Sequence, residues 1–115
     1  MAQEVVSLGG LKPFLVTLKD TEKFQRLLSG FPETMGLKSG HLILKPGENI
    51  GEHVTENKEE VIIVLKGKAM VICGVDDEPI VAGERSVVYV PPETKHDVKN
   101  IGENILEYIY VTAAA

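Results

Sequence analysis

The chain has 115 residues, of which 43% are hydrophobic and 25% are charged, and its formal net charge is -5. This length suits a single domain, because two separate cores would each fall near the lower size limit of independent folding. The 12 Lys and Arg residues are dispersed and outnumbered by 17 Asp and Glu residues, which argues against a nucleic-acid partner. No apolar stretch reaches the roughly 20 residues that span a bilayer, and Met1 to Glu4 lack the basic, then apolar start of a secretory signal. We therefore expect a cytoplasmic protein without a membrane partner.

One segment near the start of the chain has the pattern of a short helix. Asp20 or Thr21 can cap it, and Gly30 can end it before the next proline. Its apolar face would consist of Phe24, Leu27 and Leu28.

The remainder of the chain is rich in Val, Ile and Tyr and is divided by turn residues. This pattern predicts short strands over 38–45, 60–65, 69–73, 80–82, 86–90 and 105–111. Such spacing is typical of an all-β sandwich or barrel. We expect Cys73, the single cysteine, to be a packed strand residue, and Asp76 to Glu78 to form a surface turn with too few spaced ligands for calcium.

Two of the predicted strands, 60–65 and 105–111, are apolar on both faces over residues 61–65 and 106–111. One face would fill the barrel, so the other needs a cover, and a second copy of the chain would provide one in a homodimer. The alternative is a cover from the chain's own N-terminal segment, whose apolar residues are Leu11, Phe14, Leu15 and Val16.

Glu60 is the first residue that points to chemistry. Strand alternation places its carboxylate on the same face as Ile62 and Val64, and a buried carboxylate needs a cation, a metal or several hydrogen bonds beside it. In an extended chain His53 and Thr55 share one face. His96, which follows Pro91 and Pro92, likewise shares a face with Val98.

Two groups of residues resemble the cupin motifs. The first motif, a Gly, five residues, His-x-His, four residues, Glu, six residues and Gly, is matched by Gly47, His53, Thr55, Glu60 and Gly67. The second is matched by Gly83, Pro91, His96 and Asn100. The resemblance implies a single-domain jelly-roll β-barrel of six to eight strands, with the barrel over 38–112 and an N-terminal strand and helix extension over 1–37. The chain departs from the motifs at Thr55, where the second His is missing, and at Glu93, where Gly is usual.

Carried over residue by residue, the resemblance makes His53, Glu60 and His96 ligands of a divalent metal. Two imidazoles and a carboxylate suit Fe, and they also accept Mn, Ni, Co or Zn. Thr55 would either hold a metal-bound water in the vacated position or simply favour the strand. Further alternatives are a metal-free cluster of hydrogen-bonded His and Glu, and ligation by Glu59 or His41.

The predicted barrel would also enclose a cavity for a small-molecule ligand or substrate. Its candidate lining residues are Thr55, Ile62, Met70 and Tyr108, with Met35 as a further candidate. Candidate catalytic residues are Tyr110, Glu52 and Glu56. Lys95 and Glu93 would meet an anionic ligand at the mouth or form a solvated turn.

These features predict a small metal-binding cupin that acts on a small polar or sugar-like molecule. The implied chemistry is that of an isomerase, epimerase or oxygenase. A module that binds or senses a ligand without turning it over is the alternative, and a purely structural, metal-free subunit is a third.

Overall fold

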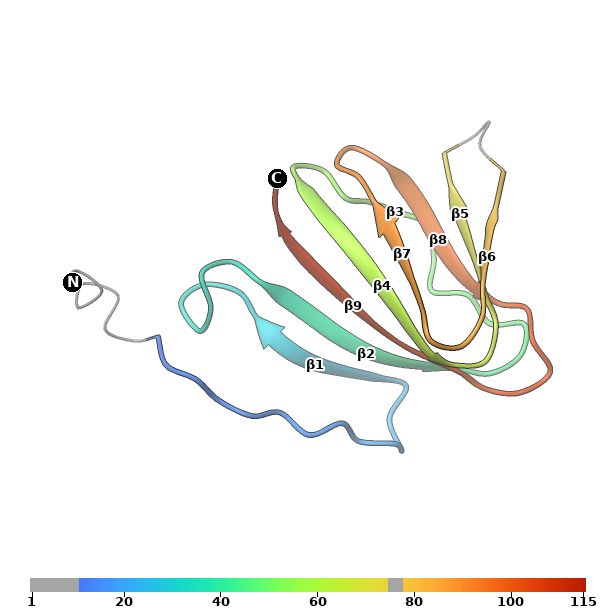
Figure 1. Cartoon of the computed structure of the whole chain (residues 1–115), viewed down its shortest axis with the longest axis horizontal. Coiled ribbons are helices and arrows are strands. Elements are labelled where there is room, and N and C mark those ends of the chain that lie inside the picture. Colours follow the sequence, from blue (N-terminus) through green and yellow to red (C-terminus); the bar gives the residue numbers. More distant parts are fainter. Residues whose placement is uncertain (1–10, 75–77) are drawn as a thin grey trace.

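A computed structural model describes residues 11–74 and 78–115, which form nine β-strands (Figure 1). The strands are β1 (Phe24–Ser29), β2 (Lys38–Leu44), β3 (His53–Val54), β4 (Lys58–Lys66), β5 (Ala69–Cys73), β6 (Ile80–Ala82), β7 (Ser86–Val90), β8 (Lys95–Asn100) and β9 (Leu106–Ala114). Five form one sheet in the order β1-β2-β9-β4-β7, and four form a second in the order β3-β8-β5-β6. All named pairs are antiparallel.

The core lies between the two sheets. Strand alternation turns every second side chain of β4 and β9 inward, so that Ile62, Val64 and Tyr108 are buried while Val61 and Ile63 are only half-buried on the opposite face. The small sheet contributes Val71 and Val98. This two-layer packing confirms the all-β fold that the sequence predicts.

The predicted N-terminal helix is wrong, because the segment forms strand β1 and the described ranges contain no helix. β1 pairs with β2, with Phe24 opposite Leu42 and Arg26 opposite Gly40. Three apolar residues in two turns give a weak helix, since short helices are marginal on their own. Without β1, β2 would be an edge strand with unpaired backbone groups, and that pairing outweighs the local helical preference.

The other strand predictions agree with the structure to within a few residues, and β3 and β8 are additions to the predicted set. Cys73 ends β5, half-buried against the core, as expected of a packed strand residue. The predicted acidic turn begins at Asp76 and Asp77, which lie outside the described residues. Within the ranges described, no helix is long and apolar enough to cross a membrane.

The outer face of the five-stranded sheet remains apolar and open. Val87 and Tyr89 of β7 are exposed there. The segment 11–19 runs beside β1 (Figure 1), where the Gln25 side chain contacts the backbone of Thr17 and Lys19. Leu15 in this segment is 89% exposed and Phe14 and Val16 are also exposed, whereas Leu11 is half-buried, so most of the apolar side chains of the segment are not buried against the sheet.

Candidate metal centre

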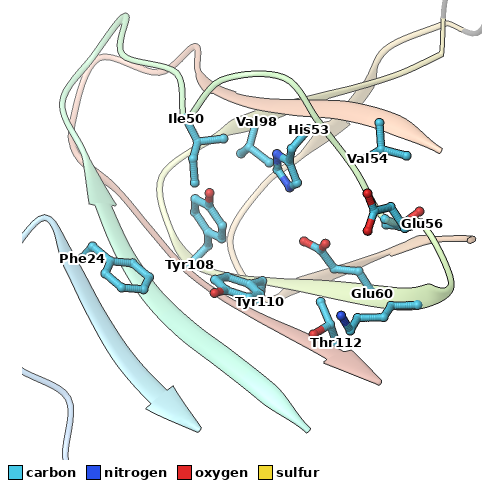
Figure 2. Close-up of a pocket in the computed structure, with 12 residues that line it drawn as sticks. Phe24, Ile50, His53, Val54, Glu56, Glu60, Val98, Tyr108, Tyr110 and Thr112 are labelled. Carbon is cyan, nitrogen blue, oxygen red and sulfur yellow. The ribbon is translucent and has the colours of Figure 1, made fainter. Parts of the chain in front are cut away.

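A cavity of about 360 Å³ opens between the two sheets. β4 and β9 line one side of it, and β3, β8 and the residues before β3 line the other (Figure 2). Phe24 of β1 closes one end, which gives the unpredicted strand a place in the cavity wall. Its lining residues are Phe24, Ile50, His53, Val54, Thr55, Glu56, Lys58, Glu60, Val98, Tyr108, Tyr110 and Thr112.

His53 and His96 are brought together by the pairing of β3 with β8. They are direct partners in the register, and their ring centroids lie 4.1 Å apart. The Nδ1 atom of His53 is 3.1 Å from the Gly51 carbonyl oxygen, and that of His96 is 3.2 Å from the Thr94 carbonyl oxygen. A carbonyl only accepts, so both Nδ1 atoms carry the hydrogen, and in the neutral rings both Nε2 atoms present a lone pair.

Glu60 approaches the two rings from the opposite sheet. Its residue is 6% exposed, and its Oε1 atom lies 3.3 Å from Nε2 of His96. His53, Glu60 and His96 each offer a ligand atom, and these atoms lie within 4.8 Å of one another. Of the three, His53 is exposed and the other two are buried, so the group sits where the cavity meets solvent.

The donor atoms fit a divalent metal ion. Nε2 of His96 is buried and has no aligned hydrogen-bond partner within the described ranges, despite its nearness to Glu60. A buried nitrogen without a partner is costly, and a metal ion would satisfy it. Two neutral imidazoles and one carboxylate are ligands that Fe, Mn, Ni, Co and Zn accept.

The same surroundings act on the titration of His96. Burial of the ring lowers its pKa, because it disfavours the charged form. Three groups favour the charged form and oppose the effect of burial: Glu60, the Thr94 carbonyl and the charge of Asp97. On balance the pKa of His96 is raised. Protons therefore compete with a metal for this nitrogen.

Thr55 lies beside the cluster, but its hydroxyl is already engaged. Oγ1 donates to the Pro91 carbonyl at 2.7 Å and accepts from the Thr94 backbone N–H at 3.0 Å. The residue is 7% exposed. Thr55, which directly follows β3, thus ties the end of that strand to the turn that precedes His96, a role that the motif comparison did not indicate.

Two tyrosines of β9 form the floor of the cavity. The Tyr110 hydroxyl accepts a hydrogen bond of 2.8 Å from Arg26 Nη1, and the Arg26 guanidinium lies over the Phe24 ring. Gly40 makes room for this arrangement, because a Cβ atom there would lie 2.5 Å from the Tyr110 ring and 2.7 Å from that of Phe24. Tyr108 is buried, and burial together with the charge of Glu60 raises its pKa well above the ordinary value.

The structure separates the other predicted site residues into two groups. Glu56 lines the cavity, as do Thr55, Tyr108 and Tyr110. The remaining candidates are not among the lining residues: Glu52, Ile62, Met70, Met35, Lys95 and Glu93. Ile62 is buried deeper in the core, and Met70 alternates with inward-facing Val71 on β5. Lys58, which lines the cavity, was not predicted, and only its position two residues before Glu60 could have indicated it.

The alternative ligands lie elsewhere. His41 is fully buried on β2, and its Nε2 atom lies 2.7 Å from Glu107 Oε2, outside the group of ligand atoms. Glu59 points to the opposite face of β4 from Glu60, where it accepts a hydrogen bond from the Tyr89 hydroxyl and raises the pKa of that phenol.

Comparison with known proteins adds independent findings. The family model described as a cupin domain, Cupin_2, matches residues 40–112. An uncharacterized protein of Methanocaldococcus jannaschii is 34% identical over 80 residues, which cover 70% of this chain and 67% of that protein. The polyketide synthase CurC of Streptomyces cyaneus is 26% identical over 110 residues, which cover 87% of this chain and 69% of that protein.

Solved structures agree on the fold. A crystal structure of an RmlC-like cupin family protein from Methanocaldococcus jannaschii, with a double-stranded β-helix fold, has a TM-score of 0.71 and 27% identity, covering 89% of this chain and 91% of that one. A predicted oxalate decarboxylase from Thermotoga maritima has a TM-score of 0.65 at 15% identity, and the match covers 88% of this chain and 100% of that one. At that identity the second likeness concerns the fold alone.

Proposed function

The chain belongs to the cupin domain family, and from that membership we propose that it is a metal-dependent enzyme acting on a small oxygen-bearing molecule. The observation that supports this most is the meeting of ligand atoms from His53, Glu60 and His96 within 4.8 Å at the wall of a cavity. Three protein ligands leave coordination positions open, as catalytic sites do. A divalent ion held there would supply Lewis-acid or redox chemistry to a carbonyl or hydroxyl group.

The chain's own residues would prepare that site. The Gly51 and Thr94 carbonyls fix the tautomers and orientations of the two histidines. Ile50, Val98 and the two tyrosine rings give the cavity apolar walls. Glu56 supplies a carboxylate on the cavity wall for proton transfer in an isomerase or epimerase, and an oxygenase would need no such group.

A binding or sensing module is the second candidate. Apart from Glu60, the charged side chains that line the cavity are Glu56 and Lys58, and Glu56 is exposed. A protein that holds a ligand without turning it over needs no more than this. Metal removal separates the two functions, because it would abolish turnover by an enzyme but only weaken ligand binding by a module.

The metal site itself is tested by a pair of neighbouring substitutions. Glu60→Gln keeps the shape of the side chain but replaces the charged ligand by a poor one, so metal content after loading with Fe, Mn, Ni, Co or Zn should fall at least about tenfold. Glu59→Gln is the matched control, because Glu59 faces away from the cavity. Equal metal content in both variants, measured by mass spectrometry, would overturn the proposal.

We also propose that the partner of the open sheet face is a second copy of the chain. Exposed Val87 and Tyr89 continue the half-buried apolar face of β4 and β9, and Leu15 projects from the segment beside β1. A dimer would cover both at once. Val87→Lys should shift the sedimentation behaviour toward the monomer, whereas Val81→Lys, at an exposed valine of the other sheet, should not. A wild-type monomer at all concentrations would contradict the proposal.

A further inference from the structure

The hydroxyl of Tyr108 is a cavity group that the metal site leaves unused. Tyr108 lies on β9, opposite Val64 of β4 on one side and Leu42 of β2 on the other. The residue is 1% exposed, yet it lines the cavity. Figure 2 shows its hydroxyl pointing away from β9 into the cavity, toward Ile50. Within the described ranges no hydrogen bond joins this hydroxyl to another residue.

The Tyr108 hydroxyl meets the open space of the cavity. Among the described residues, the buried side-chain atoms without a partner are His41 Nδ1 and His96 Nε2, and the Tyr108 hydroxyl is not one of them. Water or a bound molecule in the cavity can therefore reach it, although the rest of the side chain is packed in the core. The hydroxyl of the neighbouring Tyr110 differs, because it accepts a hydrogen bond from Arg26. The partner of the Tyr108 hydroxyl therefore comes from the contents of the cavity.

The position of this hydroxyl relates it to the metal ligands. Ile50 donates its backbone N–H to the Val98 carbonyl at 3.0 Å, so the two residues are neighbours on the wall that Tyr108 faces. Val98 follows His96 by two residues on the same face of β8, which is about 7 Å along the strand. A molecule held at the histidines and extending along this wall would reach Tyr108.

We propose that Tyr108 donates a hydrogen bond to an oxygen atom of the bound molecule and so selects the class of ligand. That class is a small carbonyl or carboxylate compound with one oxygen for the site at His53, Glu60 and His96 and a second oxygen a few bonds away. This inference rests on the proposed function. The raised pKa keeps the phenol protonated, which suits a donor and not a base. Phe24, Ile50 and Val98 favour a flat or apolar body, and the cavity has the volume of about a dozen water molecules at about 30 Å³ each.

Benzoylformate is a suitable probe, because it combines a keto oxygen, a carboxylate and a flat ring. The experiment loads the protein with Co²⁺ and titrates it with benzoylformate, following the visible absorption of the cobalt. Tyr108→Phe should leave the Co²⁺ affinity within about twofold of the wild type and weaken benzoylformate binding about five- to tenfold, the loss of one hydrogen bond. The melting temperature of the metal-free variant should equal or exceed that of the wild type, because no internal hydrogen bond is lost.

Tyr89→Phe is the matched control, since it removes a hydroxyl that donates to Glu59 on the outer face of the sheet, outside the cavity. It should weaken benzoylformate binding by less than about twofold. Equal benzoylformate affinity in the wild type and Tyr108→Phe, or equal losses in the two variants, would overturn the role of Tyr108. Absence of benzoylformate binding to the cobalt-loaded wild type at millimolar concentration would overturn the ligand class. A wild-type chain that takes up no cobalt would overturn the proposed function and this inference with it.

Discussion

His53 and His96 are register partners in the pairing of β3 with β8, with their rings inclined at 59° and their centroids 4.1 Å apart. β3 has only two residues, so this pairing is what holds His53 in place. Strand β8 therefore carries one imidazole and also holds the strand that carries the other. The buried carboxylate of Glu60 completes the group from the opposite sheet.

Removal of His96 should consequently abolish metal binding. We expect His96→Ala to retain less than about a tenth of the wild-type metal content, because one of three ligands is lost. The β-sheet circular dichroism spectrum should persist, since the remaining core is intact. His41→Asn is the control, a change at another buried histidine whose ring nitrogen contacts Glu107 outside the site. Stoichiometric metal in His96→Ala would show that His96 is not a ligand.

The grouping of His53, Glu60 and His96 was predicted from the resemblance of the sequence to the cupin motifs, and the structure brings the three side chains together. Two-residue periodicity alone predicted only that the Glu60 side chain shares a strand face with Ile62 and Val64. The engagement of Thr55 could not be predicted in this way, because its partners are a carbonyl at Pro91 and an N–H at Thr94. Backbone groups have no sequence signature of their own. The bond between Arg26 and Tyr110 joins residues far apart in sequence, and it requires strand β1, which local preference predicted as a helix.

The clamp at Thr55 should contribute measurably to stability. Thr55→Val keeps the shape of the side chain but leaves the Pro91 carbonyl and the Thr94 N–H without their partner. Loss of these bonds should lower the free energy of unfolding by about 1–3 kcal/mol, as measured by urea denaturation. Thr55→Ser restores the hydroxyl and should recover most of this loss. If Thr55→Val is no more destabilising than Thr55→Ser, the two hydrogen bonds of the hydroxyl do not stabilise the fold and the clamp is contradicted.

Gly40 should be required for the tyrosine floor of the cavity. Gly40→Ala places a Cβ atom against the rings of Tyr110 and Phe24, so one ring must move and the Arg26 contact must weaken. We expect a loss of about 1–3 kcal/mol in stability, the usual cost of overpacking. Gly83→Ala, where an added Cβ meets nothing within 4 Å, is the control. Equal stability of the two variants would show that the rings are free to shift.

The raised pKa of His96 sets the direction of pH effects on the metal-free protein. A folded-state pKa above the unfolded value of about 6.5 means that the folded protein binds the proton on His96 more strongly than the unfolded chain does. This contribution is fully present below about pH 6.5 and is lost as the pH rises through the folded-state pKa. The contribution of His96 to the melting temperature of the metal-free protein should therefore decrease as the pH rises from about 6.5 through the folded-state pKa.

Metal binding should show the opposite trend, because a histidine must lose its proton before it can be a ligand. We expect the rise in melting temperature caused by saturating Co²⁺ to grow between about pH 5.5 and pH 8, and the Co²⁺ affinity to increase by about 10- to 100-fold per pH unit at the acidic end, for one or two protons released. Calorimetric melting with and without Co²⁺ across this range provides the measurement. In the metal-free protein, His96→Ala should remove the decrease in melting temperature that His96 causes as the pH rises. His41→Asn should leave that decrease in place. A stabilisation by Co²⁺ that does not change with pH would contradict ligation by the two imidazoles.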